Sequence, residues 1–215
     1  MSFRILMTGA TGYLGRALCL RMPGVREIVA LVRPGARRRV VDGVRSVELD
    51  VFDVAQLAAA MQAGDTVVHL IGTPHPNPRK AAEFQRVDLA SVRACAAAAA
   101  RAGAAHFIYV SVAQPAPVMR EYVEARRAGE AAIVAAGLTA TILRPWYVLG
   151  PGHRWPYLLL PLYGIAKLLP GARATARRLG LVTLAQMTSA LLRAAEHPPP
   201  RGTRRILEVP QIRAA

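Results

Sequence analysis

Short apolar runs alternate with helix-forming segments along most of the chain. Runs rich in Val, Ile and Leu, bounded by turn residues, predict buried strands. The expected strands span residues 3–9, 27–33, 44–50, 65–72, 106–112, 139–145 and 204–210. Helices are expected at 13–22, 54–62, 80–102 and 184–196, with a further one that contains Tyr122 and ends at Gly137.

This alternation predicts a parallel sheet. Parallel strands need crossover helices, and right-handed crossovers place those helices on both faces of the sheet. The expected fold is therefore α/β, a Rossmann-like doubly wound parallel sheet, in one domain over residues 1–215. Residues 150–181, where prolines accumulate, are expected to form a substrate-side insertion over the carboxyl edge of the sheet, the edge at which such folds bind ligands.

Composition narrows the class of protein. With 215 residues, of which 53% are hydrophobic and 19% charged, the chain is expected to be globular with one sizeable core. Its cysteines, Cys19 and Cys95, lie in apolar helical segments and are expected to be buried free thiols, which suits a reducing cytoplasm. The five histidines are scattered without ligand spacing, so no metal site is predicted.

The net charge of +15 comes almost entirely from arginine. Such an excess suits an anionic ligand, an anionic lipid surface or nucleic acid. The densest clusters are residues 37–39, 177–178 and 204–205, and the other arginines are dispersed. Because the chain has neither zinc-finger spacing nor a basic helix with interleaved aromatic residues, nucleic acid is the least favoured of these partners.

The most apolar segment, residues 155–170, is interrupted by prolines, a glycine and Lys167. A membrane-spanning helix needs about 20 predominantly apolar residues, so this segment is not expected to span a membrane. It is expected either to line an apolar pocket or to make a peripheral contact with a membrane surface. The N-terminus enters a strand at once without a leader pattern, and a cytoplasmic location is expected.

The first predicted strand runs into TGATGYLGR, in which Gly9, Gly12 and Gly15 are spaced by three. A glycine turn between a strand and a helix directs backbone N–H groups and the helix dipole at one point, which suits a pyrophosphate. Gly9 and Gly12 would permit the turn and a close approach, and Gly15 would let the helix pack on the sheet. The segment therefore predicts a dinucleotide site; the alternative is a tight turn that binds nothing.

The end of the second predicted strand distinguishes the two nicotinamide cofactors. A carboxylate there would bind ribose hydroxyls, whereas an arginine would bind a 2′-phosphate. Arg33 occupies this position and residues 37–39 follow, so NADP(H) is preferred, with NAD(H) or a solvated basic loop as alternatives. Asp50, which ends the third predicted strand, is expected either at the adenine edge or as the cap of the helix that starts near Val54.

These motifs, in this order, resemble the short-chain dehydrogenase/reductase superfamily, specifically its extended, epimerase- and dehydratase-like branch and its atypical branch. The glycine spacing of TGATGYLG matches those branches, and the similarity continues through ELDVFD, VVHLIG, HFIYVSV, YVEARRAGEAAIVAAGL and TILRPWYVLGPG. It is strong over residues 3–150 and looser in the tail. The chain most resembles the atypical NAD(P)H-binding group that includes the NmrA-like redox sensors and relatives of a complex I accessory subunit.

The resemblance implies that a nicotinamide dinucleotide lies along the carboxyl edge of the sheet. Implied contacts in and after the glycine turn are Gly9, Thr11, Gly12, Tyr13, Leu14 and Gly15. Further implied contacts are Arg33, Asp50, Val51, Ile71 and Gly72, with Pro145, Tyr147 and Val148 near the nicotinamide.

The resemblance also implies catalytic positions. In catalytic members, a serine after the fifth strand and a Tyr-x-x-x-Lys helix support hydride transfer between the nicotinamide and a carbonyl or alcohol carbon. Ser111 and Tyr122 match the serine, which holds the substrate oxygen, and the tyrosine, which exchanges its proton. The lysine position holds Arg126, and Asp88 stands where many relatives have asparagine.

Arg126 changes what this site can do. A free tyrosine titrates near pH ~10, so acid–base work at neutral pH needs a nearby cation. Four residues after Tyr122 on a helix, Arg126 can supply that charge and bind a ribose hydroxyl, but it cannot release a proton as lysine can. The alternative explanation is an ordinary exposed pair on a surface helix.

Three functions remain open from the sequence. The first is an NADP(H)-dependent oxidoreductase acting on a small apolar carbonyl, quinone or similar substrate. The second is a non-catalytic NAD(P)H-binding sensor or assembly protein, as among NmrA-like relatives. The third is a basic protein that holds nucleic acid or anionic lipid. The sequence also leaves open whether the chain is a monomer or a homodimer.

Overall fold

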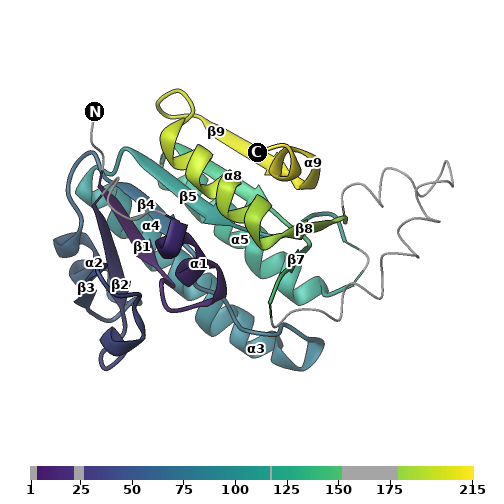
Figure 1. Ribbon diagram of the computed structural model, residues 1–215, viewed down its shortest axis with the longest axis horizontal. Helices are drawn as coiled ribbons and strands as arrows, with labels where there is room; N and C mark the ends of the chain where they lie inside the picture. Colours follow the sequence, from purple (N-terminus) through teal and green to yellow (C-terminus); the bar gives the residue numbers. More distant parts are fainter. Residues whose placement is uncertain (1–3, 22–26, 117, 152–178) are drawn as a thin grey trace, which may run out of the picture.

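The computed structural model describes residues 4–21, 27–116, 118–151 and 179–215. They form a seven-stranded sheet in the order β3-β2-β1-β4-β5-β6-β9, with every neighbouring pair parallel (Figure 1). The strands are β1 (Ile5–Thr8), β2 (Ile28–Val32), β3 (Arg45–Glu48), β4 (Thr66–His69), β5 (His106–Val110), β6 (Ala140–Arg144) and β9 (Arg204–Glu208). The Rossmann-like doubly wound sheet predicted from the alternation of strands and helices is confirmed.

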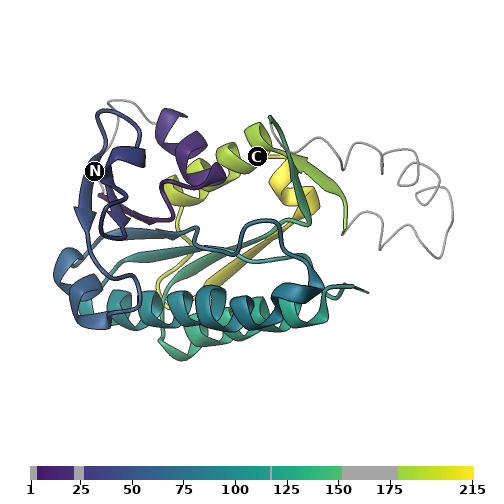
Figure 2. The same cartoon turned by 90° about the horizontal axis from the view of Figure 1, so that it is seen from below.

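Helices cover both faces of this sheet (Figure 2). On one face lie α1 (Tyr13–Arg21), α8 (Leu184–Glu196) and α9 (Val209–Arg213). On the other face lie α2 (Val54–Ala60), α4 (Ala90–Ala102) and α5 (Arg120–Ala135). Shorter helical segments are the 3₁₀ turns η1 (Arg37–Arg39) and η2 (Pro78–Lys80), α3 (Ala81–Glu83) and the π-helical η3 (Phe84–Leu89), which continues into α4.

Alternate residues of the central strands belong to two apolar cores. In β1, Leu6 packs in the core under α2, α4 and α5, whereas Ile5 and Met7 pack in the core under α1 and α8. Strand side chains alternate between faces, and a sheet covered on both faces must be apolar at successive positions. All residues of β1 and β2 are accordingly buried. Cys19 and Cys95 are buried free thiols, as predicted.

Some features lie outside the sequence pattern. A second, two-stranded parallel sheet pairs β7 (Tyr147–Leu149) with β8 (Leu181–Thr183), and its three-residue strands are too short to show a period. The predicted insertion at 150–181 and the apolar segment at 155–170 fall mostly or wholly outside the described residues. Among the residues that are described, no helix is long and apolar enough to cross a membrane.

Helix α5, which carries Tyr122, is held close to the sheet by a glycine on its inner side. A Cβ atom at Gly129 would lie 2.8 Å from both the Tyr109 hydroxyl and Cγ1 of Val92. Such distances are shorter than side chains tolerate, so a larger residue must push α5 away from β5 and α4. The position of the functional helix therefore depends on Gly129.

Replacing Gly129 tests this packing. Gly129→Val is expected to lower the free energy of unfolding by about 1–3 kcal/mol through overpacking, measured by urea unfolding. The control Ala131→Val adds the same side chain at an exposed position of the same helix and should cost about 0.7 kcal/mol or less. Equal losses in the two variants would contradict the packing account.

Candidate active site

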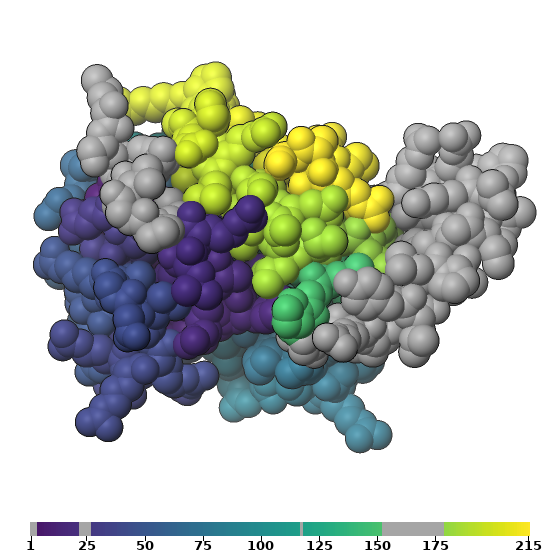
Figure 3. Space-filling view, viewed as in Figure 1, coloured from purple at the N-terminus to yellow at the C-terminus, as the bar shows by residue number. Residues whose placement is uncertain are grey.

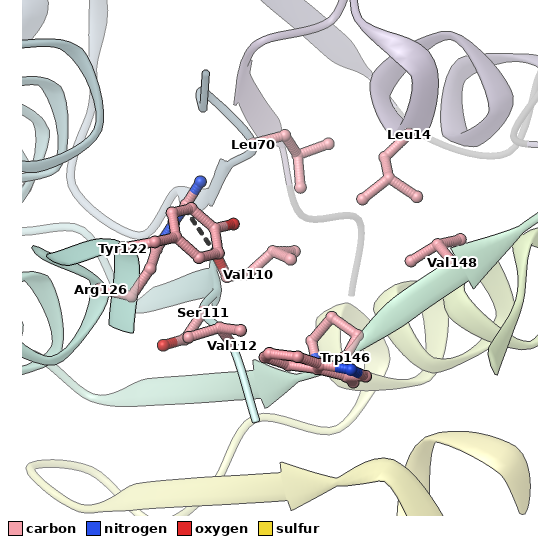
Figure 4. A pocket seen from close by; sticks show the side chains of 10 residues that line it. Leu14, Leu70, Val110, Ser111, Val112, Tyr122, Arg126, Trp146 and Val148 are labelled. Carbon is pink, nitrogen blue, oxygen red and sulfur yellow. Dashed lines mark hydrogen bonds between the residues drawn. The ribbon is translucent and has the colours of Figure 1, made fainter. Parts of the chain in front are cut away.

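A cavity of about 170 Å³ lies where β1, β4, β5 and β6 end (Figure 4). The strand order reverses between β1 and β4, and ligands bind at such reversal points in open parallel sheets. Most of the lining residues have apolar side chains, but polar atoms make up about half of the exposed lining surface. The lining residues are Leu14, Leu70, Val110, Ser111, Val112, Tyr122, Arg126, Pro145, Trp146 and Val148.

The turn from β1 into α1 is compact because its glycines meet backbone atoms. Gly9 has a φ of 76°, which favours glycine, and a Cβ there would lie 2.7 Å from the carbonyl carbon of Leu70. A Cβ at Gly15 would overlap the carbonyl oxygen of Gly9, so α1 begins directly on the turn. The turn is closed by the Gly12 N–H, which donates to the carbonyl of Gly9 at 3.0 Å. The N-terminus of α1 thereby lies at the edge of the cavity.

The residues after the first glycine of this turn take different positions. Thr11 is half-buried, Gly12 is exposed, and Leu14 lines the cavity. The Tyr13 hydroxyl lies against Gly150, where a Cβ would overlap it. The glycine turn is therefore packed against the chain that leaves β7.

The basic loop after β2 is open to solvent. Arg33 is exposed, and no carboxylate pairs with it among the described residues. Arg16 of α1 donates to the carbonyl of Arg39 at 2.9 Å, which ties the arginine run of η1 to the helix that follows the glycine turn. This hydrogen bond therefore holds the exposed arginines of η1 next to α1, the helix that follows the glycine turn.

Asp50 does not cap helix α2. The cap is Asp53, whose Oδ1 accepts from the N–H groups of Ala55 and Gln56. Asp50 is exposed, and its Oδ1 accepts from the N–H of Phe52 at 3.0 Å. The capping alternative for Asp50 is therefore wrong, because a later aspartate takes that position; the adenine contact of Asp50 and its neighbour remains a prediction.

A buried ion pair between Arg126 and Asp88 lies beside the cavity. Arg126 Nη2 donates to Asp88 Oδ1 at 2.6 Å, and Nη1 donates to the carbonyl of Val110 at 2.9 Å. The side chain of Asp88 is fully buried, and that of Arg126 is 7% exposed. Asp88 Oδ2 accepts from both the N–H and the hydroxyl of Thr73, at 3.0 and 2.6 Å. The explanation of Arg126 as an exposed surface residue is therefore wrong.

The guanidinium is enclosed by aromatic rings and backbone. Arg126 Cζ lies 5.2 Å from the ring centre of Tyr122 and 5.7 Å from that of Tyr109. A Cβ at Gly72 would overlap its Nη2, so a larger residue there would displace the guanidinium. Burial by itself lowers the pKa of Arg126, but attraction to Tyr122, Tyr109 and Asp88 outweighs burial, and the pKa is raised above its usual value. Arg126 Nε is buried without a hydrogen-bond partner among the described residues.

Two residues of η3, four positions apart, contact two residues of α5 that are also four positions apart. The ring of Phe84 packs edge-on against that of Tyr122, with centres 5.0 Å apart, and Asp88 binds Arg126. Phe84 and Asp88 both lie in the π-helical η3 (Phe84–Leu89). Single π turns are frequent at functional sites, and this one places both contacts against the tyrosine helix.

The hydroxyl of Ser111 is occupied. It donates to Oε1 of Glu130 at 2.5 Å, and in Figure 4 the Ser111 oxygen points away from the centre of the cavity. The next residue, Val112, lines the cavity with an apolar side chain. The structure therefore directs the predicted substrate-orienting hydroxyl towards a carboxylate, away from the Tyr122 hydroxyl.

Glu130 was not among the site residues predicted from the sequence. This buried carboxylate also accepts from Gln114 Nε2 at 2.7 Å and from Arg144 Nε and Nη2 at 3.0 and 2.5 Å. Arg144 donates in addition to Glu208 of β9 at 3.0 Å. Its position four residues after Arg126, on the same helical face, is the feature of the sequence that could have predicted its place near the site.

Two buried histidines lie in the sheet. Nδ1 of His69 lies 2.9 Å from the hydroxyl of Thr8, and Nε2 lies 3.3 Å from that of Ser91. Burial, aided by the positive charge of Arg126, lowers the pKa of His69 to about 3. Burial likewise lowers the pKa of His106 to about 4. Both rings are therefore neutral at ordinary pH.

Comparisons with known proteins fit this geometry. A family model described as NAD(P)H-binding matches residues 9–154. Ceramide reductase from Caulobacter vibrioides (strain NA1000 / CB15N) is 32% identical over 185 residues, which cover 80% of this chain and 55% of the relative. The chain therefore spans about half the length of that curated relative.

Solved structures show the same fold. MoeE5 in complex with UDP-glucuronic acid and NAD superposes with a TM-score of 0.70 at 18% identity, covering 97% of this chain and 79% of that one. WbmG from Bordetella bronchiseptica, in complex with NAD and UDP, superposes with a TM-score of 0.66 at 20% identity, covering 97% and 73%. At such identities the likeness establishes the fold.

The buried histidines predict a loss of stability in acid. A free histidine titrates near 6.5, and His69 titrates near 3 when folded, so acid favours the unfolded chain. The stability from its neutral burial is complete above about pH 6.5 and declines as the pH falls towards 3. Between pH 7.5 and 5, His69 should account for a loss of about 2 kcal/mol in the free energy of unfolding.

Urea unfolding at several pH values measures this contribution. His69→Gln should remove the share of His69 from the pH dependence and leave that of His106. The control His197→Gln changes an exposed ring and should retain the wild-type slope. A wild-type slope in His69→Gln would contradict the assignment.

Proposed function

The chain belongs to the NAD(P)H-binding family, in the atypical group of the short-chain dehydrogenase/reductase superfamily, and from this membership we propose that it is an NADP(H)-dependent reductase of an apolar carbonyl compound. The observation that carries the proposal is the position of Tyr122. Its ring lines the cavity at the carboxyl edge of the sheet, with the ring centre 5.2 Å from Cζ of Arg126. A phenol beside a positive charge is a suitable proton donor for a carbonyl oxygen.

The residues around the cavity fit a nicotinamide dinucleotide. The glycine turn and the N-terminus of α1 suit a pyrophosphate, because both present backbone N–H groups. The unpartnered buried Nε of Arg126 is a donor that suits a ribose hydroxyl. Residues with proposed adenosine contacts are Arg33, Asp50 and Val51, and those proposed nearer the nicotinamide are Ile71, Gly72, Pro145, Tyr147 and Val148.

When bound in this site, a reduced nicotinamide dinucleotide would supply the hydride for the carbonyl carbon. Tyr122 donates its phenolic proton to the carbonyl oxygen, which gives an alcohol, and then regains a proton from solvent. Arg126 lies beside the resulting tyrosinate as the cationic half of its ion pair with Asp88. It does not relay the proton, because a guanidinium does not release one at ordinary pH.

A lipid ketone is the proposed substrate class. The curated relative is named a ceramide reductase, and the side chains across the cavity from Tyr122 are apolar. Figure 4 shows Leu14, Leu70, Val148 and Trp146 around this space. Its volume is below the roughly 300 Å³ typical for a drug-sized ligand, so it suits the reacting groups better than a whole lipid.

The second candidate is an NAD(P)H-binding sensor or assembly protein with little turnover. The occupied Ser111 hydroxyl favours it, because among the described residues that line the cavity the hydroxyl other than that of Tyr122 is then held by a carboxylate. A comparison of two variants separates the candidates.

Tyr122→Phe is expected to reduce NADPH oxidation on a panel of lipid ketones by about 10²–10⁴-fold, the usual contribution of a positioned acid, without weakening cofactor binding. Ser111→Ala, the matched loss of one hydroxyl, should lower turnover less than about tenfold. It should also lower the free energy of unfolding by about 1.5–3 kcal/mol, because Glu130 loses a charge-assisted hydrogen bond. Equal turnover losses would contradict the assigned roles, and indifference to Tyr122→Phe would favour the sensor.

Cofactor preference is tested by titration with NADPH and NADH. NADPH should bind about 10- to 100-fold more tightly, as one or two charge-assisted hydrogen bonds to a 2′-phosphate would give. Arg33→Asp should remove most of this difference. Arg101→Asp is a control at an exposed arginine near the end of α4, and it should leave the preference intact. Equal affinities in the wild type would overturn the NADP(H) assignment.

A further inference from the structure

The positive charge next to Tyr122 is already paired. Asp88 is fully buried and lies 2.6 Å from Nη2 of Arg126, while its other oxygen is held by Thr73. The position of the carboxylate is therefore fixed from two sides. Tyr122 faces an ion pair with no net charge, whereas an unpaired Arg126 would present a full positive charge.

Whether Arg126 is paired or unpaired affects how readily the phenol gives up its proton. An unpaired cation about 5 Å away stabilises tyrosinate, because opposite charges attract most strongly where water is excluded. A carboxylate bound to that cation offsets most of the attraction. A tyrosine beside a paired cation therefore gives up its proton less readily than one beside a free cation.

We propose that Asp88 is a positioning residue for the reaction: it holds Arg126 as half of an ion pair, so that Tyr122 serves as a proton donor to a carbonyl, in the direction of reduction. This inference rests on the proposed reductase function.

The other groups around this pair fit the assignment. From β5, the buried Tyr109 faces Arg126, and burial raises the pKa of Tyr109 to about 12, so it stays neutral. From β4, His69 interacts with Arg126 and is neutral because burial lowers its pKa to about 3. The other side of the Tyr122 ring meets the uncharged ring of Phe84. Asp88 is thus the carboxylate that offsets Arg126 among the described residues.

The test compares Asp88→Asn with Asp88→Glu. The alkaline limb of the pH profile for kcat/KM in NADPH oxidation should move to lower pH by about one unit or more in Asp88→Asn. Asp88→Glu keeps the charge and should restore a limb close to that of the wild type. Coincident limbs in the wild type and Asp88→Asn would overturn the proposal.

A second readout needs neither cofactor nor turnover. The ultraviolet absorption of tyrosinate is titrated in the wild type and in Asp88→Asn, each with Tyr122→Phe as its baseline, so that the difference reports Tyr122. This absorption should appear at lower pH in Asp88→Asn. An unchanged titration together with measurable turnover would reject the role of Asp88 and leave the reductase standing. A shifted titration without turnover on any ketone would support the role and reject the reductase.

If Asp88→Asn does not fold, the double variant Asp88→Asn/Arg126→Lys replaces it. This variant retains a cation at position 126 and replaces the buried carboxylate with an uncharged amide. Tyrosinate absorption should again appear at lower pH than in the wild type. Absorption at the wild-type pH or above it would overturn the proposal.

Discussion

The arrangement of this site depends on the buried ion pair between Asp88 and Arg126. Removing one partner of such a pair leaves an unpaired charge in the interior, which costs about 3–5 kcal/mol, so a change of either residue alone is expected to lower stability strongly. The pair joins three segments: the chain after β4 through Thr73, the π-helical η3, and helix α5. A guanidinium held in this way is both a structural contact and a fixed charge beside Tyr122.

The rest of the fold gives this pair its surroundings. Parallel strands end at a common edge, so the glycine turn after β1 and the tyrosine helix after β5 approach the same cavity. Figure 3 shows the face of the molecule that α1, α8 and α9 cover. Close packing without Cβ atoms at Gly9, Gly72 and Gly129 lets backbone and guanidinium approach one another. These glycines therefore help to set the positions of Arg126, of the helix that carries Tyr122 and of the turn after β1, as the charged residues also do.

Much of the fold was predictable from the sequence, because strands covered on both faces must be apolar throughout and so appear as unbroken runs. The shared face of Tyr122 and Arg126 was predictable from helical spacing. Burial of Arg126 was not, since its partner Asp88 lies 38 residues away. The direction of Ser111 also depended on a distant carboxylate, Glu130. Short strands such as β7 and β8 carry too few residues to give a periodic signal.

Taken together, the glycine turn, the paired arginine and the cavity beside Tyr122 form the site that we propose for a nicotinamide and an apolar carbonyl. The most direct test is a crystal structure of the complex with NADPH. The account predicts the pyrophosphate at the turn formed by residues 9–14, a ribose hydroxyl at Arg126 and the nicotinamide ring in the cavity facing Tyr122. A nicotinamide bound outside that cavity, or a cofactor that does not touch the glycine turn, would contradict it.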